Sequence, residues 1–141
     1  MAVQTASAEW NGSLKEGDGK MRVGTGAFEG PFTFASRFEN GKGTNPEELI
    51  AAAHAGCFSM ALSGQLGNAG MTAESIATTA TVNLEKTDAG FTITAVHLDV
   101  KAKIPGADKA AFETAAKNAK AGCPVSRVLN AAITMDATLE A

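Results

Sequence analysis

Cys57 and Cys123 are the residues of this 141-residue chain that are best suited to covalent chemistry, and the chain has no other cysteine. The first ten residues lack the basic start and the apolar run of a secretory signal, so we expect a cytoplasmic protein. In a reducing compartment a permanent disulfide is rare, whereas a transient catalytic one is plausible. A buried free cysteine also behaves as a small hydrophobe. Composition alone therefore favours two inert core residues.

The two cysteines occupy different positions relative to the predicted helices. Cys57 lies midway along a predicted helix, about 11 residues after its start, where the helix dipole has faded and does not lower a thiol pKa by itself. Arg37 is a candidate source of positive charge, although a solvated loop arginine is the simpler interpretation. Cys123 directly precedes Pro124, which predicts that it caps a short helix. That end of a helix stabilises a negative sulfur.

Other kinds of site have weaker support in the sequence. His54 lies one helical turn before Cys57, and with Cys123 or His97 these residues could bind a metal ion. A histidine among alanines is more often a hydrogen-bonded core residue. The glycines near residue 42 lack the phosphate-loop pattern. We therefore expect no metal and no other cofactor.

Composition and charge exclude some partners. Hydrophobic residues make up 45% of the chain, the formal net charge is −3, and like charges form no long run, so no nucleic acid is expected. The stretch 49–66 is apolar but is broken by His54, serines and Gln65, which makes it a poor membrane span. We interpret it as a buried helix and expect no membrane partner.

The pattern of residues predicts an α+β fold with antiparallel sheet, in one domain over residues 1–141. Asn45 caps the central helix, with Pro46 in its first turn. A turn at 88–90 joins two long strands, and the second strand changes face near residues 95–96, as a bulge would cause. The expected elements are short strands around 8–10, 20–23 and 32–34, a helix from 46 to about 67, the long hairpin from 76 to 104, helices at 107–121 and 124–129, and a closing strand at 132–139.

Two segments, 37–62 and 121–126, closely resemble the OsmC/Ohr family of peroxide-reducing proteins, and the first looks most like the osmotically induced branch. The most specific parts are the helix start Asn45–Leu49 followed by Cys57, and the run Gly122–Ser126. The resemblance implies an intertwined homodimer in which antiparallel sheets wrap two central helices, with active sites at the subunit interface. It also implies a role in oxidative or osmotic stress defence.

The resemblance assigns roles residue by residue. Cys57 corresponds to the peroxidatic cysteine and Cys123 to the resolving cysteine, and Arg37 with Glu47 to the pair that activates Cys57. The expected substrates are organic hydroperoxides and hydrogen peroxide, and the expected reductant is a thiol, for which the family suggests a dihydrolipoyl protein. No metal, haem or flavin is needed.

One geometric check bears on the dimer. If Glu47 and Cys57 share a continuous helix, its rise separates them by about 15 Å along the axis, so their side chains do not meet. Either Glu47 acts from the partner subunit or Arg37 spans the distance on a mobile loop, and we favour a shared interfacial site. The alternative function is a binding protein whose cavity holds a hydrophobic small molecule, with both cysteines merely buried.

Overall fold

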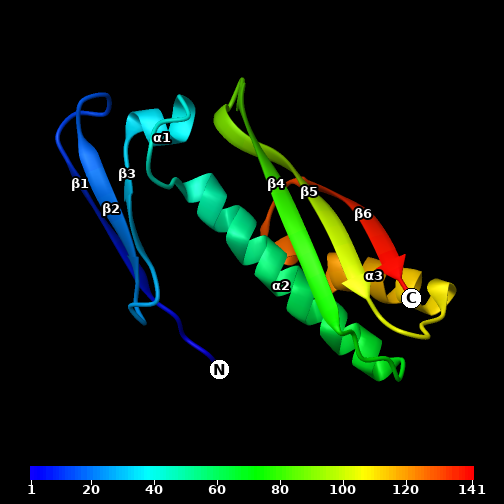
Figure 1. Cartoon of the computed structure of the whole chain (residues 1–141). Coiled ribbons are helices and arrows are strands. Elements are labelled where there is room, and N and C mark those ends of the chain that lie inside the picture. The colour runs from blue at the N-terminus through cyan, green and yellow to red at the C-terminus, as the bar shows by residue number, and fades with distance from the viewer. The chain divides into compact units, whose positions relative to one another are not determined.

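A computed structural model describes all residues from 1 to 141, and the chain divides into two compact units, residues 1–49 and 50–141. Each unit is described by itself. The central helix α2 (Pro46–Asn68) begins in the first unit and continues through the second (Figure 1). The expectation of a single domain over residues 1–141 stays a prediction.

The first unit is a small antiparallel sheet followed by a short helix. Its strands β1 (Ala6–Asn11), β2 (Asp18–Val23) and β3 (Glu29–Phe32) lie in the order β1-β2-β3. The prediction of a strand at 32–34 was wrong beyond Phe32, because Thr33 is the N-cap of helix α1 (Phe34–Phe38). Thr33 and Ser36 form a capping box, which satisfies two backbone N–H groups reciprocally. Arg37 therefore lies on a helix and not in a loop.

Helix α2 confirms the predicted central helix and its cap. The Asn45 side-chain oxygen accepts a hydrogen bond of 2.7 Å from the backbone N–H of Glu48. Phe58, Leu62 and Leu66 recur every fourth residue and are fully buried in the core. By length and composition α2 is apolar enough to cross a membrane, but a core helix of a soluble protein passes the same test. In this chain 22% of its most apolar stretch is buried, on the side that carries Phe58, Leu62 and Leu66.

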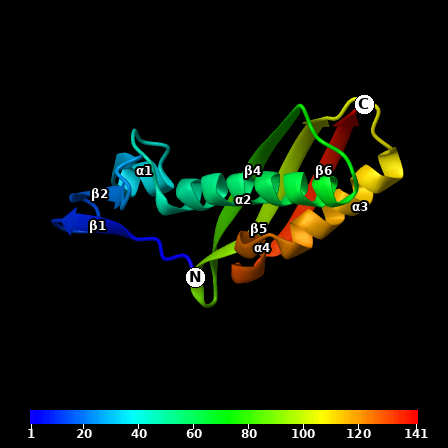
Figure 2. The same cartoon turned by 90° about the horizontal axis from the view of Figure 1, so that it is seen from below.

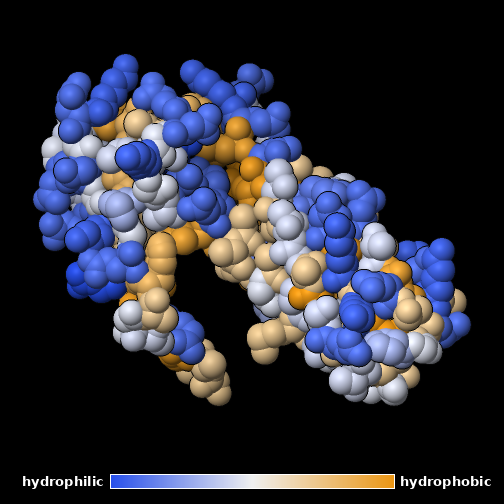
Figure 3. Space-filling model, viewed as in Figure 1, coloured by the Kyte–Doolittle hydropathy of each residue, from blue (hydrophilic) through white to orange (hydrophobic).

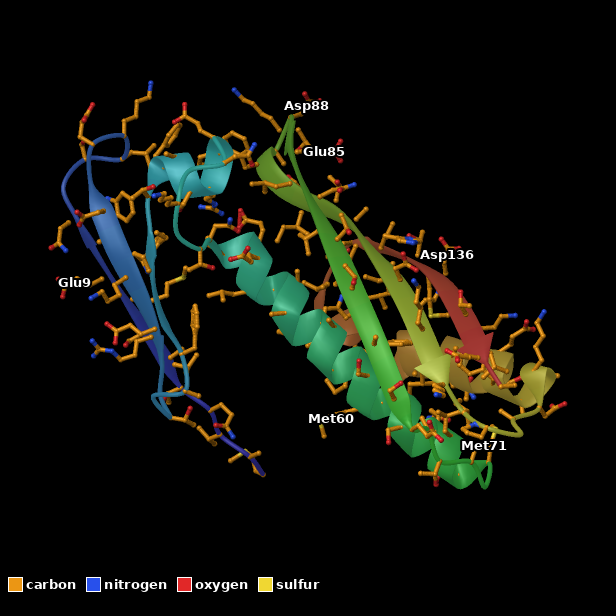
Figure 4. The ribbon with its side chains drawn as sticks, viewed as in Figure 1. Glu9, Met60, Met71, Glu85, Asp88 and Asp136 are labelled. Atoms are coloured by element: carbon orange, nitrogen blue, oxygen red, sulfur yellow. The ribbon has the colours of Figure 1, made fainter.

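The opposite side of α2 is open and built from small residues. Met60 is 80% exposed and points away from the sheet in Figure 4. Gly56 and Gly64 have no neighbouring atom within 4 Å of the position that a Cβ would take. Figure 3 shows apolar-leaning surface along this part of the chain. An apolar helix face that remains exposed in the single chain is available for a partner.

The second unit contains the long hairpin of β4 (Ser75–Thr87) and β5 (Gly90–Lys103). Asn83 pairs with Ala95 and Leu84 with Ile93, so Thr94 is the extra residue of a bulge. The predicted change of face at 95–96 is therefore confirmed to within two residues. Beyond the bulge, Val96, Leu98 and Val100 alternate into the core with exposed residues on the other face.

The closing strand β6 (Ala132–Glu140) pairs with β5 in parallel, which differs from the antiparallel sheet that the sequence predicted. A parallel neighbour requires a crossover. Here the crossover consists of α3 (Lys109–Gly122) and α4 (Pro124–Val128). Phe112, Ala115, Ala116 and Ala119 of α3 are buried in the same core as α2 and β5 (Figure 2). The α+β class is confirmed. Because β5 and β6 are parallel, the segment that joins them is a crossover.

Candidate active site

The two cysteines, far apart in sequence, are in contact in the structure. The Sγ atoms of Cys57 and Cys123 are 2.7 Å apart, and both residues are free thiols. Cys57 is half-buried on α2, and Cys123 is fully buried. A disulfide bond needs sulfurs at about 2.05 Å with suitable Cβ directions. The pair is therefore close enough to form a disulfide with little backbone movement.

Cys123 is held at the junction of two helices. It is the C-cap of α3, where its N–H donates to the carbonyl of Ala119 at 3.0 Å, and also the N-cap of α4. Its φ of −56° and ψ of 127° are extended, as expected for a residue before proline. The predicted N-cap position is confirmed. The chain turns sharply at Cys123, and this turn directs the thiol toward α2.

The electrostatics of Cys57 come from its immediate neighbours. Burial raises the pKa of the Cys57 thiol, and the hydrogen bond with Cys123 raises it further, while the backbone N–H of Val125 donates to the sulfur and lowers it. The α4 terminus thus acts on Cys57, whereas Cys123 makes no side-chain capping bond. The sequence analysis missed Val125. Its signal was Pro124, which marks the start of α4, because the first N–H groups of a helix have no intrahelical partner.

His54 has a partner that the sequence did not predict. Its Nε2 lies 2.7 Å from the hydroxyl oxygen of Ser126 on α4. The ring is fully buried, its Nδ1 has no hydrogen-bond partner, and burial lowers its pKa. His97, the other histidine, instead contacts Thr134 and Asp136. No cluster of three or more His, Cys, Asp or Glu residues could hold a metal ion.

Arg37 and Glu47 form a bidentate ion pair within the first unit. The Nε of Arg37 lies 2.8 Å from Oε1 of Glu47, and its Nη2 lies 3.2 Å from Oε2. Helix α1 supplies the arginine and the first turn of α2 supplies the carboxylate. Glu47 is buried, so this ion pair is stronger than one exposed to solvent. A solvated loop arginine was therefore the wrong interpretation of Arg37, and Nη1 takes no part in the pair.

An apolar cavity of about 240 Å³ adjoins Arg37 within the first unit. Two aromatic contacts shape its wall, Trp10 with Phe32 and Phe34 with Phe38, at centroid distances of 5.2 and 4.9 Å. The Arg37 guanidinium lies 5.4 Å from the centre of the Phe38 ring. The cavity is lined by Trp10, Leu14, Phe32, Thr33, Phe34, Arg37 and Phe38.

The structure thus brings the predicted site residues together as two pairs. Cys57 and Cys123 lie in the unit 50–141, and Arg37 and Glu47 in the unit 1–49. Residues 39–138 match the family model described as OsmC-like protein. The chain belongs to the OsmC family. The resemblance that the sequence indicated is confirmed, although the family match does not assign a role to any single residue.

Similar OsmC proteins are known from bacteria. A protein named Peroxiredoxin OsmC from Escherichia coli (strain K12) is 53% identical over 134 residues, which are 94% of each chain. The protein of the same name from Shigella flexneri matches to the same extent. Because they cover 94% of this chain, these matches extend over both units.

Solved structures of OsmC and Ohr proteins share the fold. An organic hydroperoxide resistance protein OsmC from Legionella pneumophila has a TM-score of 0.73 at 23% identity, and both chains are covered completely. OhrB of Bacillus subtilis has a TM-score of 0.70 at 21% identity, with 95% of this chain and 98% of that chain covered. At such identities the likeness shows the fold alone, which confirms the predicted fold class.

The buried His54 makes stability depend on pH. Its native pKa lies below the usual 6.5, so its contribution to stability is complete above that pH and is lost as the pH falls toward the native pKa. We expect the free energy of unfolding to fall below about pH 6.5, by up to about 1.4 kcal/mol per pH unit for one proton. His54→Gln should flatten this slope. Urea unfolding between about pH 5 and 8 measures it.

His97→Gln is the matched control, because His97 is partly exposed and hydrogen-bonded to Thr134. This variant should keep most of the pH dependence of the free energy of unfolding, since His54 remains in place. An equal slope in wild type and His54→Gln would contradict the prediction.

Proposed function

We propose that the protein is a cysteine-based peroxidase that reduces organic hydroperoxides, and also hydrogen peroxide. Cys57 attacks the peroxide and Cys123 resolves the product. The contact of 2.7 Å between the two thiols carries the proposal. A peroxiredoxin-type activity is further supported by the 53% identity to proteins named Peroxiredoxin OsmC over 94% of the chain.

The proposed chemistry uses two thiols and one peroxide. The Cys57 thiolate attacks one peroxide oxygen, the O–O bond breaks, and the alkoxide leaves as an alcohol after taking up a proton. Cys57 is then a sulfenic acid. The sulfur of Cys123 attacks it, water leaves, and a Cys57–Cys123 disulfide forms. A thiol reductant, of which a dihydrolipoyl protein is the proposed type, reopens the disulfide by exchange.

The attack requires a thiolate, and the immediate surroundings of Cys57 oppose it. Burial and the neighbouring thiol both raise its pKa, and the single N–H of Val125 opposes them. A cation must therefore approach the sulfur in the reactive state. Arg37 is the proposed cation. Glu47 orients its guanidinium through Nε and Nη2, and Nη1 remains to bind the thiolate or a peroxide oxygen.

We propose that the reactive site is shared between two chains of an intertwined homodimer. The open, small-residue face of α2 with exposed Met60 supports this arrangement, because it permits close approach of a second helix. In the dimer, the Arg37–Glu47 pair of one chain would act on Cys57 of the other. The aromatic cavity beside Arg37 suits the apolar part of an organic hydroperoxide whose peroxide group lies at the guanidinium.

The same cavity is the observation behind the alternative function, an apolar ligand carrier without catalysis. Thiol chemistry separates the two functions. One equivalent of an organic hydroperoxide should consume both thiols of each chain and leave a Cys57–Cys123 disulfide, as a thiol titration and peptide mass spectrometry would detect. Cys57→Ser should abolish turnover, whereas Cys123→Ser should allow the first oxidation and stop at sulfenic acid. Unchanged thiols in the wild type would favour the carrier.

The role of Arg37 can be tested against a matched ion pair. Arg37→Ala should slow the first oxidation by about 10- to 100-fold, the effect of losing one charge-assisted hydrogen bond. The control is Arg22→Ala, because Arg22 pairs with Glu29 in a similar bidentate contact on the exposed sheet. Stopped-flow kinetics of the first oxidation would compare the variants. Equal rates for wild type and Arg37→Ala would refute activation by Arg37.

Mixed dimers test whether the site is shared. A Cys57→Ser chain and an Arg37→Ala chain are each inactive or nearly so alone. If Arg37 acts on the partner, a heterodimer of the two variants contains one complete site and recovers about half of the wild-type activity per dimer. If Arg37 acts within its own chain, the heterodimer has no complete site. Tandem purification with two different tags would isolate the mixed dimer for the assay.

A further inference from the structure

The short helix α4 follows Cys123, and only its C-cap, Leu129, packs against the core. None of its residues is buried, and Val128 is 77% exposed. A helix of five residues does not hold itself by its own hydrogen bonds. Contacts with its neighbours therefore determine where α4 lies, and those with α2 hold the end that carries Cys123.

Two such contacts join α4 to α2. At the first, Cys57 meets the thiol of Cys123 and the backbone N–H of Val125. At the second, one helical turn earlier on α2, His54 bonds to the Ser126 hydroxyl at 2.7 Å. The proposed reaction changes the first contact, because the Cys57 sulfur gains an oxygen and then a bond to the sulfur of Cys123. The second contact involves no reacting atom and persists.

From this arrangement we propose that His54 is a positioning residue, which through its hydrogen bond to Ser126 holds the Cys123–Val125 turn against Cys57 while the sulfenic acid is resolved. The inference rests on the proposed function. It assigns His54 and Ser126 a part in the second step, closure of the disulfide, and no contact with the peroxide.

The surroundings of His54 fit a fixed, uncharged anchor. The ring is fully buried, and burial lowers its pKa, so it is neutral and carries one N–H. Nδ1 is the ring nitrogen without a hydrogen-bond partner. Burying an unpaired N–H donor costs more free energy than burying an unprotonated ring nitrogen. The N–H therefore belongs on Nε2 and donates to the oxygen of Ser126. A directional bond to a buried ring restricts the position of α4.

Ser126→Ala is the principal test, because Ser126 is only partly buried and alanine favours a helix. Rapid mixing with one equivalent of an organic hydroperoxide gives two rates, for sulfenic acid formation and for disulfide closure. The ratio of the rate of disulfide closure to the rate of sulfenic acid formation should fall by about tenfold, which is equivalent to about 1.4 kcal/mol. Excess peroxide should then convert more Cys57 to sulfinic acid, which mass spectrometry detects.

Three further variants separate positioning from general destabilisation. Ser126→Thr keeps the hydroxyl, and His54→Gln keeps an N–H donor near the position of Nε2, so both should recover part of the ratio. Ser59→Ala is the matched control, because Ser59 also lies on α2 and bonds at 2.8 Å to Thr78, away from α4. Its ratio should equal that of the wild type.

The outcomes are distinguishable. If wild type forms the disulfide and Ser126→Ala closes it with an unchanged ratio, the positioning role is overturned while the peroxidase proposal stands. If Ser59→Ala lowers the ratio as much as Ser126→Ala, the effect is general destabilisation and the inference is again overturned. If wild-type thiols do not react at all, the proposed function itself fails.

Discussion

The central constraint on this protein is that a thiol which is partly buried against a second thiol resists ionisation. Cys57 must lie next to Cys123 if the two are to form a disulfide, and that proximity removes water and places a second sulfur beside it. Both effects raise the pKa of Cys57, and only the N–H of Val125 acts in the other direction within its surroundings. Close packing of the two thiols thus favours the second step of a peroxidase and hinders the first.

The cation and the thiols belong to different units of the chain, and each is positioned by contacts within its own unit. Arg37 is bound by a buried Glu47, so its direction is set before any peroxide arrives. The two cysteines are set by a different group of contacts, which includes the bond of His54 to Ser126. In the proposed dimer the Arg37–Glu47 pair of one chain meets the thiols of the other. Ionisation of Cys57 would then be a property of the pair of chains and not of one chain.

Much of the fold could be predicted from the sequence, because local patterns determine it. Asn45 and Pro46 mark the start of α2, and the shift in alternation marks the bulge at Thr94. Helix α1 was missed because its five residues are too few to show a helical period, and only the Thr33 capping box identifies it. The parallel pairing of β6 was missed because the direction of a closing strand depends on contacts with β5 and not on its own residues.

The candidate site, like the fold, could be predicted from the sequence only in part. Cys57, Cys123 and Arg37 were candidates by residue type, whereas the role of Glu47 came from the family resemblance. The structure shows that Cys57 contacts Cys123 and that Arg37 pairs with Glu47. The Val125 N–H was marked only indirectly, by Pro124 at the start of α4. The His54–Ser126 bond was not predictable, because the two residues are far apart in sequence and their contact follows only from the packing of α4 on α2.

The parallel strand β6 has a consequence for the order in which the protein is made. Cys123 lies on the crossover between β5 and β6, and the end of this crossover is secured only when β6 has paired beside β5. Because β6 follows Cys123 in the chain, a growing polypeptide exposes Cys57 well before its partner thiol is in place. During synthesis Cys57 would thus be a single unpaired thiol, open to oxidation that no neighbour can reverse, until the final strand has joined the sheet.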